Sequence, residues 1–204
     1  MCAKRCIVVA GTTAGGAAAF CGIARRAGIL SLAALAVALA TGCGTAPPAP
    51  PAVRLELVDH AELLARVAAH RGKVVVLDCW STSCPPCVRE FPGLVRLAAA
   101  HPDAVACLSL SFDYEGIGSV EAAAGPVREF LRSVDAGAVE NLLSREEADV
   151  MYAKLQLDSV PAVYVWKPDG SLARRFDDDD AKRRLGRAFT YADVEAEVRA
   201  CVAQ

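Results

Sequence analysis

VVVLDCWSTSCPPC, residues 74–87, contains the apolar run and the cysteine pair around which the rest of the chain is arranged. Val74 to Leu77 is mostly β-branched and too short for a stable isolated helix, so it predicts a strand buried on both faces. Such strands belong to parallel sheets. The stretch therefore predicts an α/β fold in which two cysteines lie where a strand is followed by a helix.

A helix is predicted directly after the cysteine pair. The apolar side chains that would pack it on the sheet recur at helical spacing: Phe91, Leu94, Val95 and Ala98. Pro85 suits the first helical position, where a missing N–H costs nothing, whereas Pro92 lies further along and should bend the helix. Cys84 is therefore expected at a helix N-terminus.

The position of Cys84 favours redox chemistry. The reactive form of cysteine is the thiolate, and the unpaired N–H groups and positive dipole end of a helix stabilise negative charge. We expect Cys84 to be the nucleophile and Cys87 to resolve a mixed disulfide by exchange. The alternatives are half of a structural zinc site or two unrelated buried thiols. Zinc would need two more ligands at matching spacing, and the chain has no second C-x-x-C and no clustered His.

WSTSCPPCVREFP, residues 80–92, resembles the active-site segment of the thioredoxin superfamily, and in particular its membrane-anchored, TlpA-type thiol-disulfide oxidoreductases. The resemblance runs from about Val53 to the C-terminus. It implies an α/β thioredoxin fold, with a central mixed β-sheet flanked by helices and a helical insertion before the strand that follows the family's cis-proline.

The resemblance also implies roles for single residues. Asp78 matches the family's buried carboxylate, Trp80 its active-site tryptophan and Pro92 its helix-kinking proline. Val160–Pro161 matches the cis-proline that faces the disulfide. The residues expected to act in catalysis are Cys84, Cys87, Asp78 and Pro161. Those expected to contact a partner are Trp80, Pro85, Pro86 and Val160. Ser83 departs from the family, because many relatives have a second aromatic residue just before the first cysteine.

Asp78 interrupts an otherwise apolar strand six residues before Cys84. Burying an unpaired carboxylate is costly unless its pKa rises toward neutrality. A base with such a pKa is suited to accepting the proton of Cys87, and this is the role we expect. In the alternative interpretation, Asp78 is a polar residue that only bonds a nearby side chain or water.

The N-terminal segment has the layout of a secretory signal. Arg25 and Arg26 precede a short apolar run that ends in small residues. Ala40 to Cys43 resembles a bacterial lipobox, which implies cleavage before Cys43 and attachment of lipid to its sulfur. The alternatives are an uncleaved anchor or a plain signal peptide. Residues 1–43 are therefore expected to be a leader, and the Pro-rich residues 44–52 a semi-extended linker.

Residues 53–204 are expected to form one thioredoxin-like domain, because a 204-residue chain can bury one substantial core but hardly two. Strands are predicted at 53–57, at 74–77, at 105–112, at 162–166 and at 172–176, the last two joined by a turn at 167–170. Helices are predicted to begin after a capping box at Asp59 and Glu62, at Gly125–Pro126, at a capping box formed by Ser144 and Glu147, and at Thr190. Cys79, Cys107 and Cys201 are expected to be core residues.

The acidic run Asp177 to Asp180 is interpreted as a solvated loop, because it lacks the interleaved Gly and terminal Glu of an EF-hand. Four of the 22 Lys and Arg residues precede Cys43, whereas all 24 Asp and Glu residues follow it. The acidic balance of the remaining chain gives no sign of nucleic-acid binding.

Together these features predict a thiol-disulfide oxidoreductase that exchanges electrons with protein cysteines. It is expected to lie in the bacterial cell envelope, anchored by lipid and facing the periplasm or the extracellular side. Its expected partners are protein thiols or disulfides, a membrane or soluble redox partner, and the membrane through the lipid. No metal and no organic cofactor is expected, and the chain is expected to be a monomer.

There are two alternative functions. A peroxidase of the peroxiredoxin type needs the motif P-x-x-x-T-x-x-C, but Leu77 and Ser81 stand where the proline and threonine would be. A metallochaperone of the Sco type uses C-x-x-x-C and a distal histidine. The chain has only His60, His70 and His101, all ahead of the position of such a ligand.

Overall fold

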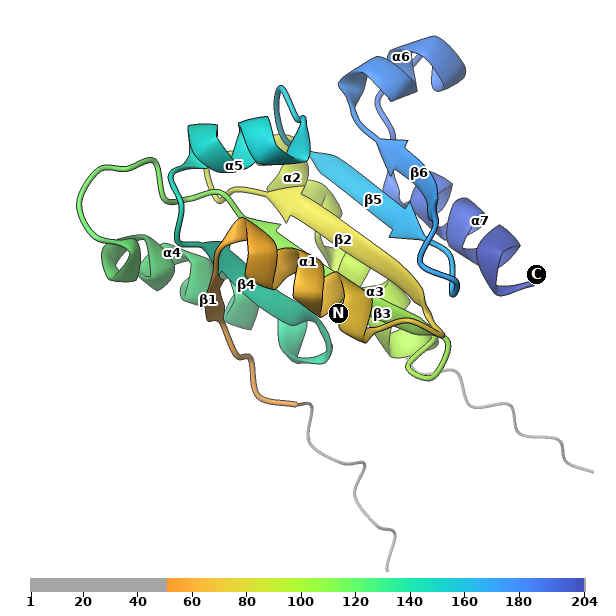
Figure 1. The fold of residues 1–204 in the computed structure, drawn as a ribbon, viewed down its shortest axis with the longest axis horizontal. Helices are drawn as coiled ribbons and strands as arrows, with labels where there is room; N and C mark the ends of the chain where they lie inside the picture. The colour runs from red at the N-terminus through yellow and green to blue at the C-terminus, as the bar shows by residue number, and fades with distance from the viewer. Residues whose placement is uncertain (1–50, 204) are drawn as a thin grey trace, which may run out of the picture. The chain divides into compact units, whose positions relative to one another are not determined.

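The computed structural model describes residues 51–203, which form a six-stranded mixed sheet with helices on both faces (Figure 1). The strands are β1 (Glu56–Val58), β2 (Val74–Trp80), β3 (Val105–Ser111), β4 (Glu140–Ser144), β5 (Ala162–Trp166) and β6 (Leu172–Phe176). Their order across the sheet is β1-β4-β3-β2-β5-β6. β1, β4, β3 and β2 are parallel, β5 pairs antiparallel with β2, and β6 pairs antiparallel with β5 and so runs in the direction of β2. This arrangement confirms the predicted mixed α/β sheet.

The helices are α1 (His60–Ala69), α2 (Pro85–Glu90), α3 (Pro92–Ala100), α4 (Val120–Ser133), α5 (Ala148–Leu155), α6 (Asp178–Leu185) and α7 (Tyr191–Val202), with a 3₁₀ turn at Ala136–Ala138. The predicted leader, residues 1–43 with Cys43, lies outside the described residues, and so do residues 44–50 of the predicted linker. None of the helices within residues 51–203 is long and apolar enough to cross a membrane.

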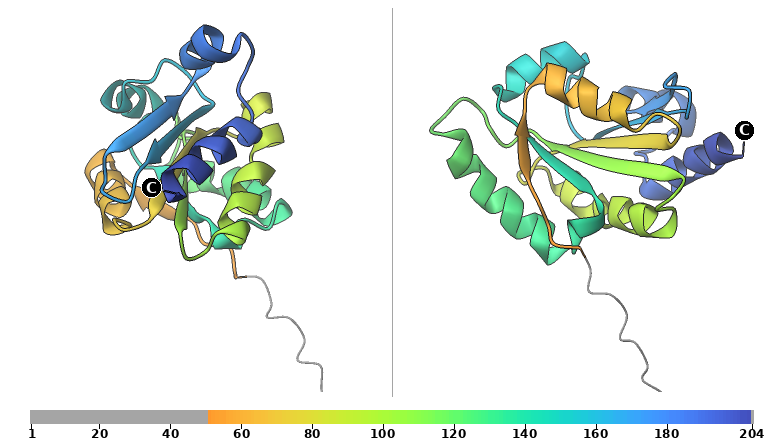
Figure 2. Two further views of the ribbon diagram at one scale, coloured as in Figure 1. Left: turned by 90° about the vertical axis from the view of Figure 1, so that its right-hand side faces the viewer. Right: turned by 60° about the horizontal axis from the view of Figure 1, so that its bottom comes forward.

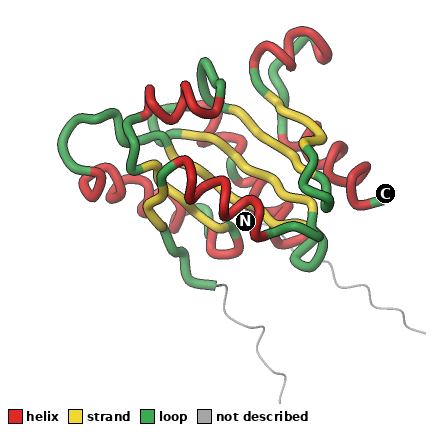
Figure 3. The backbone as a smooth tube through the Cα atoms, in the orientation of Figure 1, coloured by secondary structure: helices red, strands yellow, loops and turns green. Residues whose placement is uncertain are grey.

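β2 is buried along its whole length and divides the core in two. Val74, Val76 and Trp80 pack against α2, α3, α4 and α7, whereas Val75, Leu77 and Cys79 face α1 and α5. Figure 2 shows these two helical layers on opposite sides of the sheet, and Figure 3 shows the strands between them. Asp78 falls in the series that faces α2, α3, α4 and α7, because side chains alternate along a strand.

The predicted bend in the helix after the cysteines is confirmed as a break. α2 ends at Glu90 and α3 begins at Pro92, with Phe91 between them. Pro92 has no N–H to continue the hydrogen bonding of α2. The break lets Phe91 and Leu94 both reach the core, where each is fully buried.

Other predicted boundaries are also confirmed. Asp59 and Glu62 form a capping box at α1, and Thr190 with Asp193 forms one at α7. The turn between β5 and β6 closes with a bond from the Gly170 N–H to the Lys167 carbonyl. The outer strand is shorter than predicted: β1 begins at Glu56 and not at Val53, although Val53, Leu55 and Leu57 alternate with exposed residues as expected.

The predicted start of a helix at Gly125–Pro126 is wrong. α4 begins five residues earlier, where the Ser119 hydroxyl accepts a bond from the Ala122 N–H, and Pro126 lies inside the helix. Pro126 is exposed, and its neighbours in the helix, Ala124 and Val127, are buried in the core. Packing of this apolar face therefore outweighs the local preference of proline against a helix interior.

β4 was missed, and the predicted capping box at Ser144 is wrong. Ser144 is the last residue of β4, its hydroxyl donates to the Glu146 carbonyl, and α5 begins only at Ala148. The sequence does not predict this strand, because Asn141, whose residue type is depleted in strands, lies in its middle. The Asn141 side chain is buried and satisfied: it accepts from the Ser109 hydroxyl and donates to the carbonyls of Ala136 and Val139.

The interpretation of Asp177 to Asp180 as a solvated loop is also wrong, because Asp178–Leu185 is a helix. The Asp177 carboxylate accepts the Asp180 N–H, and Gly186 ends the helix with a φ of 65°. Acidic residues occupy the first turn of α6 and basic residues the last, and both distributions stabilise the helix dipole. The same run of charges is thus a helix signal.

Candidate active site

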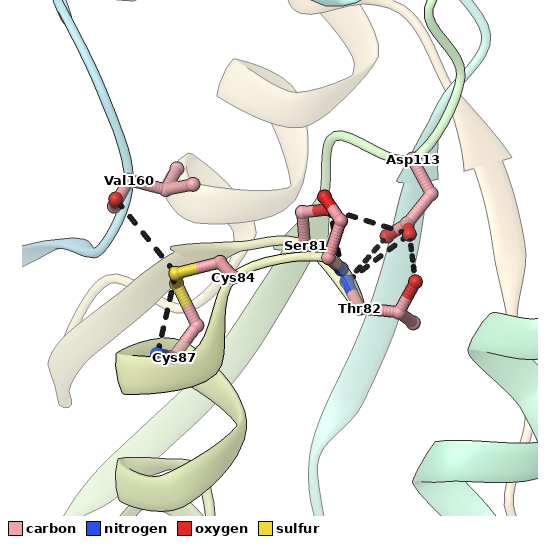
Figure 4. The surroundings of a disulfide bond; sticks show 7 residues. Ser81, Thr82, Cys84, Cys87, Asp113 and Val160 are labelled. Carbon is pink, nitrogen blue, oxygen red and sulfur yellow. Dashed lines mark hydrogen bonds between the residues drawn. A yellow bond between two sulfur atoms is a disulfide. The ribbon is translucent and has the colours of Figure 1, made fainter.

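Cys84 and Cys87 form a disulfide at the start of α2 (Figure 4). Cys84 is the N-cap residue, and its sulfur lies 3.3 Å from the backbone nitrogen of Cys87, whose N–H points at it. Cys84 is half-buried, whereas Cys87 is only 3% exposed. The two sulfurs therefore differ in accessibility, and the more accessible one receives the N–H at the helix tip.

The pair lies at the carboxyl end of β2 because that strand enters a short loop and then α2. Pro85, the first residue of α2, leaves no N–H unpaired there. The loop Ser81–Ser83 is fastened to the end of the neighbouring strand β3, which pairs in parallel with β2 up to Ser111. The sheet thus fixes the base of the loop from which Cys84 projects.

The Asp113 side chain forms the hydrogen bonds that connect this loop to the end of β3. Its carboxylate accepts the Thr82 N–H at 3.0 Å, the Thr82 hydroxyl, and the Ser111 hydroxyl at 2.5 Å (Figure 4 shows the contacts with the loop). The Ser81 hydroxyl also lies 3.3 Å from it. Asp113 is not among the residues predicted for the site. Its position directly after a buried strand that neighbours β2 was the available signal, since the ends of adjacent parallel strands lie side by side.

Asp113→Ala is expected to loosen this loop. The substitution leaves the Thr82 N–H without its acceptor, which should lower the free energy of unfolding by about 1 to 3 kcal/mol. Denaturant unfolding measures the loss, and hydrogen exchange at the Thr82 amide should become faster. Asp103→Ala, at an exposed acid in the turn before β3, is the matched control and should change neither quantity. Unchanged exchange at Thr82 in Asp113→Ala would contradict the assignment.

Val160 and Pro161 face the disulfide from the loop before β5. The Val160–Pro161 peptide bond is cis, which confirms the expected isomer. The Cys84 sulfur lies 3.8 Å from the Val160 carbonyl oxygen (Figure 4). Pro161 and Cys87 line the same cavity of about 180 Å³. The loop thus brings a backbone carbonyl and a prolyl ring next to the cysteine pair.

Asp78 also lines this cavity. Its side chain is 4% exposed, and the Tyr191 hydroxyl donates a hydrogen bond of 2.6 Å to Oδ2. Burial raises the pKa of Asp78 from 3.8 to about 7, and the bond from Tyr191 opposes this rise. The expected burial and raised pKa are confirmed. The bond to Tyr191 also fits the structural interpretation, so the role of Asp78 in proton transfer stays a prediction.

The prediction that Trp80 contacts a partner is wrong. Its side chain is fully buried and packs against Phe91 and Phe130, with ring centroids 4.7 and 4.9 Å away. It is the last residue of β2 and points into the core from the same face as Val76. Trp80 therefore packs in the core at the end of β2, directly before the loop that leads to Cys84, and does not reach the surface. Pro85, Pro86 and Val160 are exposed or half-buried.

A second hollow, of about 310 Å³, opens on the Cys84 side of the disulfide. Its lining includes Cys84, Val160, Phe112 and Tyr152. It also includes three acidic residues, one in the loop after β3, one at the N-cap of α5 and one in α5: Glu115, Glu147 and Asp149. The two cysteines thus line different hollows: Cys87 lines the mainly apolar one beside Pro161, and Cys84 lines the acidic one beside α5.

The remaining described cysteines are core residues, as expected. Cys79, Cys107 and Cys201 are unpaired thiols with at most 5% of their surface exposed. Burial raises the pKa of the Cys107 thiol to about 12 and that of Cys79 well above its ordinary value. Both thiols stay protonated and therefore unreactive near neutral pH. Within residues 51–203, no group of three or more His, Cys, Asp or Glu side chains is placed to hold a metal ion.

Solved structures provide the comparison with known proteins, since no family model matches the chain. The chain is similar to a thioredoxin-like superfamily protein, with 20% identity and a TM-score of 0.52 over 68% of this chain and 85% of that one. It is similar to a secreted Mycobacterium tuberculosis disulfide oxidoreductase described as homologous to E. coli DsbE, with 22% identity and a TM-score of 0.49 over 65% and 85%.

A third similar structure is a thiol:disulfide interchange protein of the thioredoxin family from Chlorobium tepidum, with 16% identity and a TM-score of 0.48 over 66% of this chain and 83% of that one. At these identities the likeness concerns the fold. Together with the order and directions of the six strands, the first of the three similarities shows that the chain has a thioredoxin fold.

Proposed function

We propose that the chain is a protein thiol-disulfide oxidoreductase that works through the Cys84–Cys87 pair. The observation that carries this proposal is the asymmetry of the disulfide: Cys84 is half-buried at a helix tip, whereas Cys87 is buried and lines a cavity with Asp78, whose pKa is raised to about 7. This is the arrangement that thiol-disulfide exchange requires, because one thiol must meet the partner and the other must stay close for resolution.

In the reducing direction, the Cys84 thiolate attacks one sulfur of a partner disulfide, and the other partner sulfur leaves as a thiolate. A mixed disulfide then joins Cys84 to the partner. Cys87 loses its proton to Asp78 and attacks the Cys84 sulfur, which releases the second partner thiolate. Two electrons have passed to the partner, and Cys84–Cys87 is oxidised. In the oxidising direction the same steps run backwards, and Asp78 returns the proton to Cys87.

The helix tip favours Cys84 as the attacking group. The Cys87 N–H already points at the Cys84 sulfur, so a negative charge that forms there meets a donor and the positive end of the α2 dipole. Cys87 lies inside the first turn with little exposed surface. The partner therefore reaches Cys84 first.

We further propose that the partner segment runs past Val160. The Val160 carbonyl lies beside the Cys84 sulfur at the point where the backbone turns into Pro161, so an extended partner backbone can pair there. Pro85 and Pro86 form the adjoining surface on α2. The partner's cysteine would then face Cys84 while its flanking residues occupy the two hollows.

Titration of the purified protein with glutathione buffers tests the function. The Cys84–Cys87 pair should pass between dithiol and disulfide as the buffer potential changes, and the protein should speed reduction or oxidation of a cysteine-containing peptide. A protein that accelerates neither reaction, and instead binds copper tightly, would support the metallochaperone alternative and contradict this proposal.

We propose that the protein works outside the cytoplasm, anchored by lipid on Cys43, with residues 44–52 as the tether of the thioredoxin-like domain at 53–204. The support is in the sequence: a basic pair, an apolar run and small residues precede Cys43, and a Pro-rich uncharged stretch follows it. The partners in that location would be the cysteines of envelope proteins, together with a redox partner that restores the pair.

Cys43 is expected to be the N-terminus of the mature protein. Intact-mass measurement on protein extracted from membranes should give a chain that begins at Cys43 and carries several acyl groups, because one chain alone binds membranes only marginally. Cys43→Ala should yield no acylated product, whereas Cys201→Ala, at a buried thiol of α7, should be processed normally. An unmodified mature chain that begins elsewhere would exclude the lipid anchor.

A further inference from the structure

Tyr191 connects the last helix of the domain to the buried carboxyl group of the site. It is the first residue of α7, it is 3% exposed, and its hydroxyl donates to Asp78 Oδ2 at 2.6 Å across a separation of 113 residues. Tyr191 and Asp78 line the cavity that also contains Cys87 and Pro161. The hydroxyl therefore lies at the group that we propose as proton acceptor.

Two contacts fix the backbone at Tyr191, and a third fixes its side chain. The capping box of Thr190 and Asp193 fixes the start of α7, and the Tyr191 N–H donates to the Glu90 carboxylate at 3.2 Å. Gly93 of α3 lies against the ring: a Cβ at this position would be 2.3 Å from both Cβ and Cγ of Tyr191. A residue larger than glycine at position 93 would push the ring, and its hydroxyl, away from Asp78.

Several other groups surround Asp78. Cys87, Arg89 and Glu90 of α2 and Asp178 of α6 line the shared cavity, Cys107 approaches from β3, and Cys79 is the next residue of β2. Arg89 lies 3.6 Å from the Glu90 carboxylate, and no Lys or Arg within residues 51–203 forms an ion pair with Asp78. Among the described side chains, Tyr191 is the one that donates a hydrogen bond to Asp78.

We propose that Tyr191 is a positioning residue that sets the pH range in which Asp78 accepts the proton of Cys87. This inference rests on the proposed function, because it gives a role to the same carboxyl group. A hydrogen bond to an ionised carboxylate favours the ionised form, so the Tyr191 hydroxyl partly offsets the cost of burying the charge. Burial keeps the pKa of Tyr191 itself well above its ordinary value, so the hydroxyl keeps its proton and donates throughout the working range.

Tyr191→Phe tests the inference, since it removes one oxygen and leaves the ring that packs on Gly93. The Asp78 pKa should rise by about one pH unit, because a hydrogen bond to a charged group is lost. Carbon-13 NMR of the Asp carboxyl groups in the full-length chain measures this pKa, and the Asp78 signal is identified by its absence in Asp78→Asn.

A kinetic readout uses a mixed disulfide of Cys84 with thionitrobenzoate, whose release reports the attack by Cys87. In Tyr191→Phe the midpoint of the pH–rate profile should rise with the Asp78 pKa, while the plateau at high pH stays unchanged. A merely structural role would lower the plateau or the stability and leave the midpoint in place. Tyr164→Phe is the matched control, because the buried Tyr164 hydroxyl donates to the Leu155 carbonyl on the other face of the sheet. It should move neither the Asp78 pKa nor the midpoint.

The outcomes separate this inference from the proposed function. An Asp78 pKa that stays constant or falls in Tyr191→Phe overturns the inference, whatever the exchange activity. A raised Asp78 pKa with an unmoved midpoint also overturns it. If Asp78→Asn leaves the wild-type profile unchanged as well, the assignment of Asp78 as proton acceptor fails together with it. Because Asp78→Asn removes the titration of this carboxyl group, adding Tyr191→Phe to it should leave the pH–rate profile unchanged, and a profile that changes in the double variant would again overturn the inference.

Discussion

Cys87→Ala should leave the protein covalently attached to its partners, whereas Cys84→Ala should reduce exchange to the uncatalysed rate. Without Cys87, the mixed disulfide at Cys84 has no resolving thiol close by, so it persists. Without Cys84, the buried Cys87 sulfur cannot meet a partner, because only 3% of its surface is exposed. Gel electrophoresis without reductant should show partner adducts of Cys87→Ala that disappear when reductant is added.

Cys107→Ala is the matched control for this pair of variants. Cys107 is a buried thiol of β3 whose pKa is raised to about 12, so its removal should leave both the adducts and the exchange rate unchanged. The assignment of the two roles is inverted if Cys84→Ala collects partner adducts while Cys87→Ala does not. Adducts in the double variant Cys84→Ala, Cys87→Ala would mean that another thiol reacts.

Asp78→Asn should slow resolution of the mixed disulfide by about a hundredfold or more, the usual contribution of a positioned general base. The amide keeps the shape of the carboxyl group but cannot accept a proton. Because burial raises the pKa of Asp78 to about 7, the wild-type rate should rise with pH through neutrality, and this rise should be absent in the variant. Stopped-flow release of thionitrobenzoate across roughly pH 6 to 9, the range in which such a base titrates, measures both effects.

The same substitution should stabilise the oxidised protein at alkaline pH. Between the unfolded pKa of 3.8 and the folded pKa of about 7, the folded state binds more protons at Asp78 than the unfolded state does. The contribution of Asp78 to the free energy of unfolding therefore falls as pH rises through this window and stays low above it. The predicted loss, on the order of 4 kcal/mol, should be absent in Asp78→Asn.

Denaturant unfolding of both proteins at about pH 4 and about pH 8, on either side of the titration, tests this sign. Leu77→Val, at the neighbouring buried position of β2, is a suitable control, since it changes packing without changing titration. Its difference from the wild type should be the same at both pH values. Equal pH dependence in the wild type and Asp78→Asn would mean that Asp78 titrates in the ordinary range of a carboxyl group and is structural.

Short-range signals explain what the sequence alone determined. The apolar runs predicted the buried strands β2, β3 and β5, because continuous β-branched residues suit a strand covered on both faces. Pro85 placed Cys84 at a helix tip, and Pro92 predicted the break before α3, since proline acts on the backbone within one turn. These features of the fold and of the cysteine pair depend only on residues close together in the chain.

Contacts between distant residues decided the rest. Asn141 is tolerated in β4 because Ser109 and two carbonyls satisfy it, and Trp80 is buried because Phe91 and Phe130 cover it. The Asp113 carboxylate accepts hydrogen bonds from the loop before Cys84, and the Tyr191 hydroxyl donates to Asp78 where the Tyr191 side chain packs against Gly93. Periodicity reports which face of an element is apolar, but not which partner from elsewhere in the chain meets each polar atom. The partner of each polar atom, and with it the environment of Asp78, is determined by how the helices and strands pack.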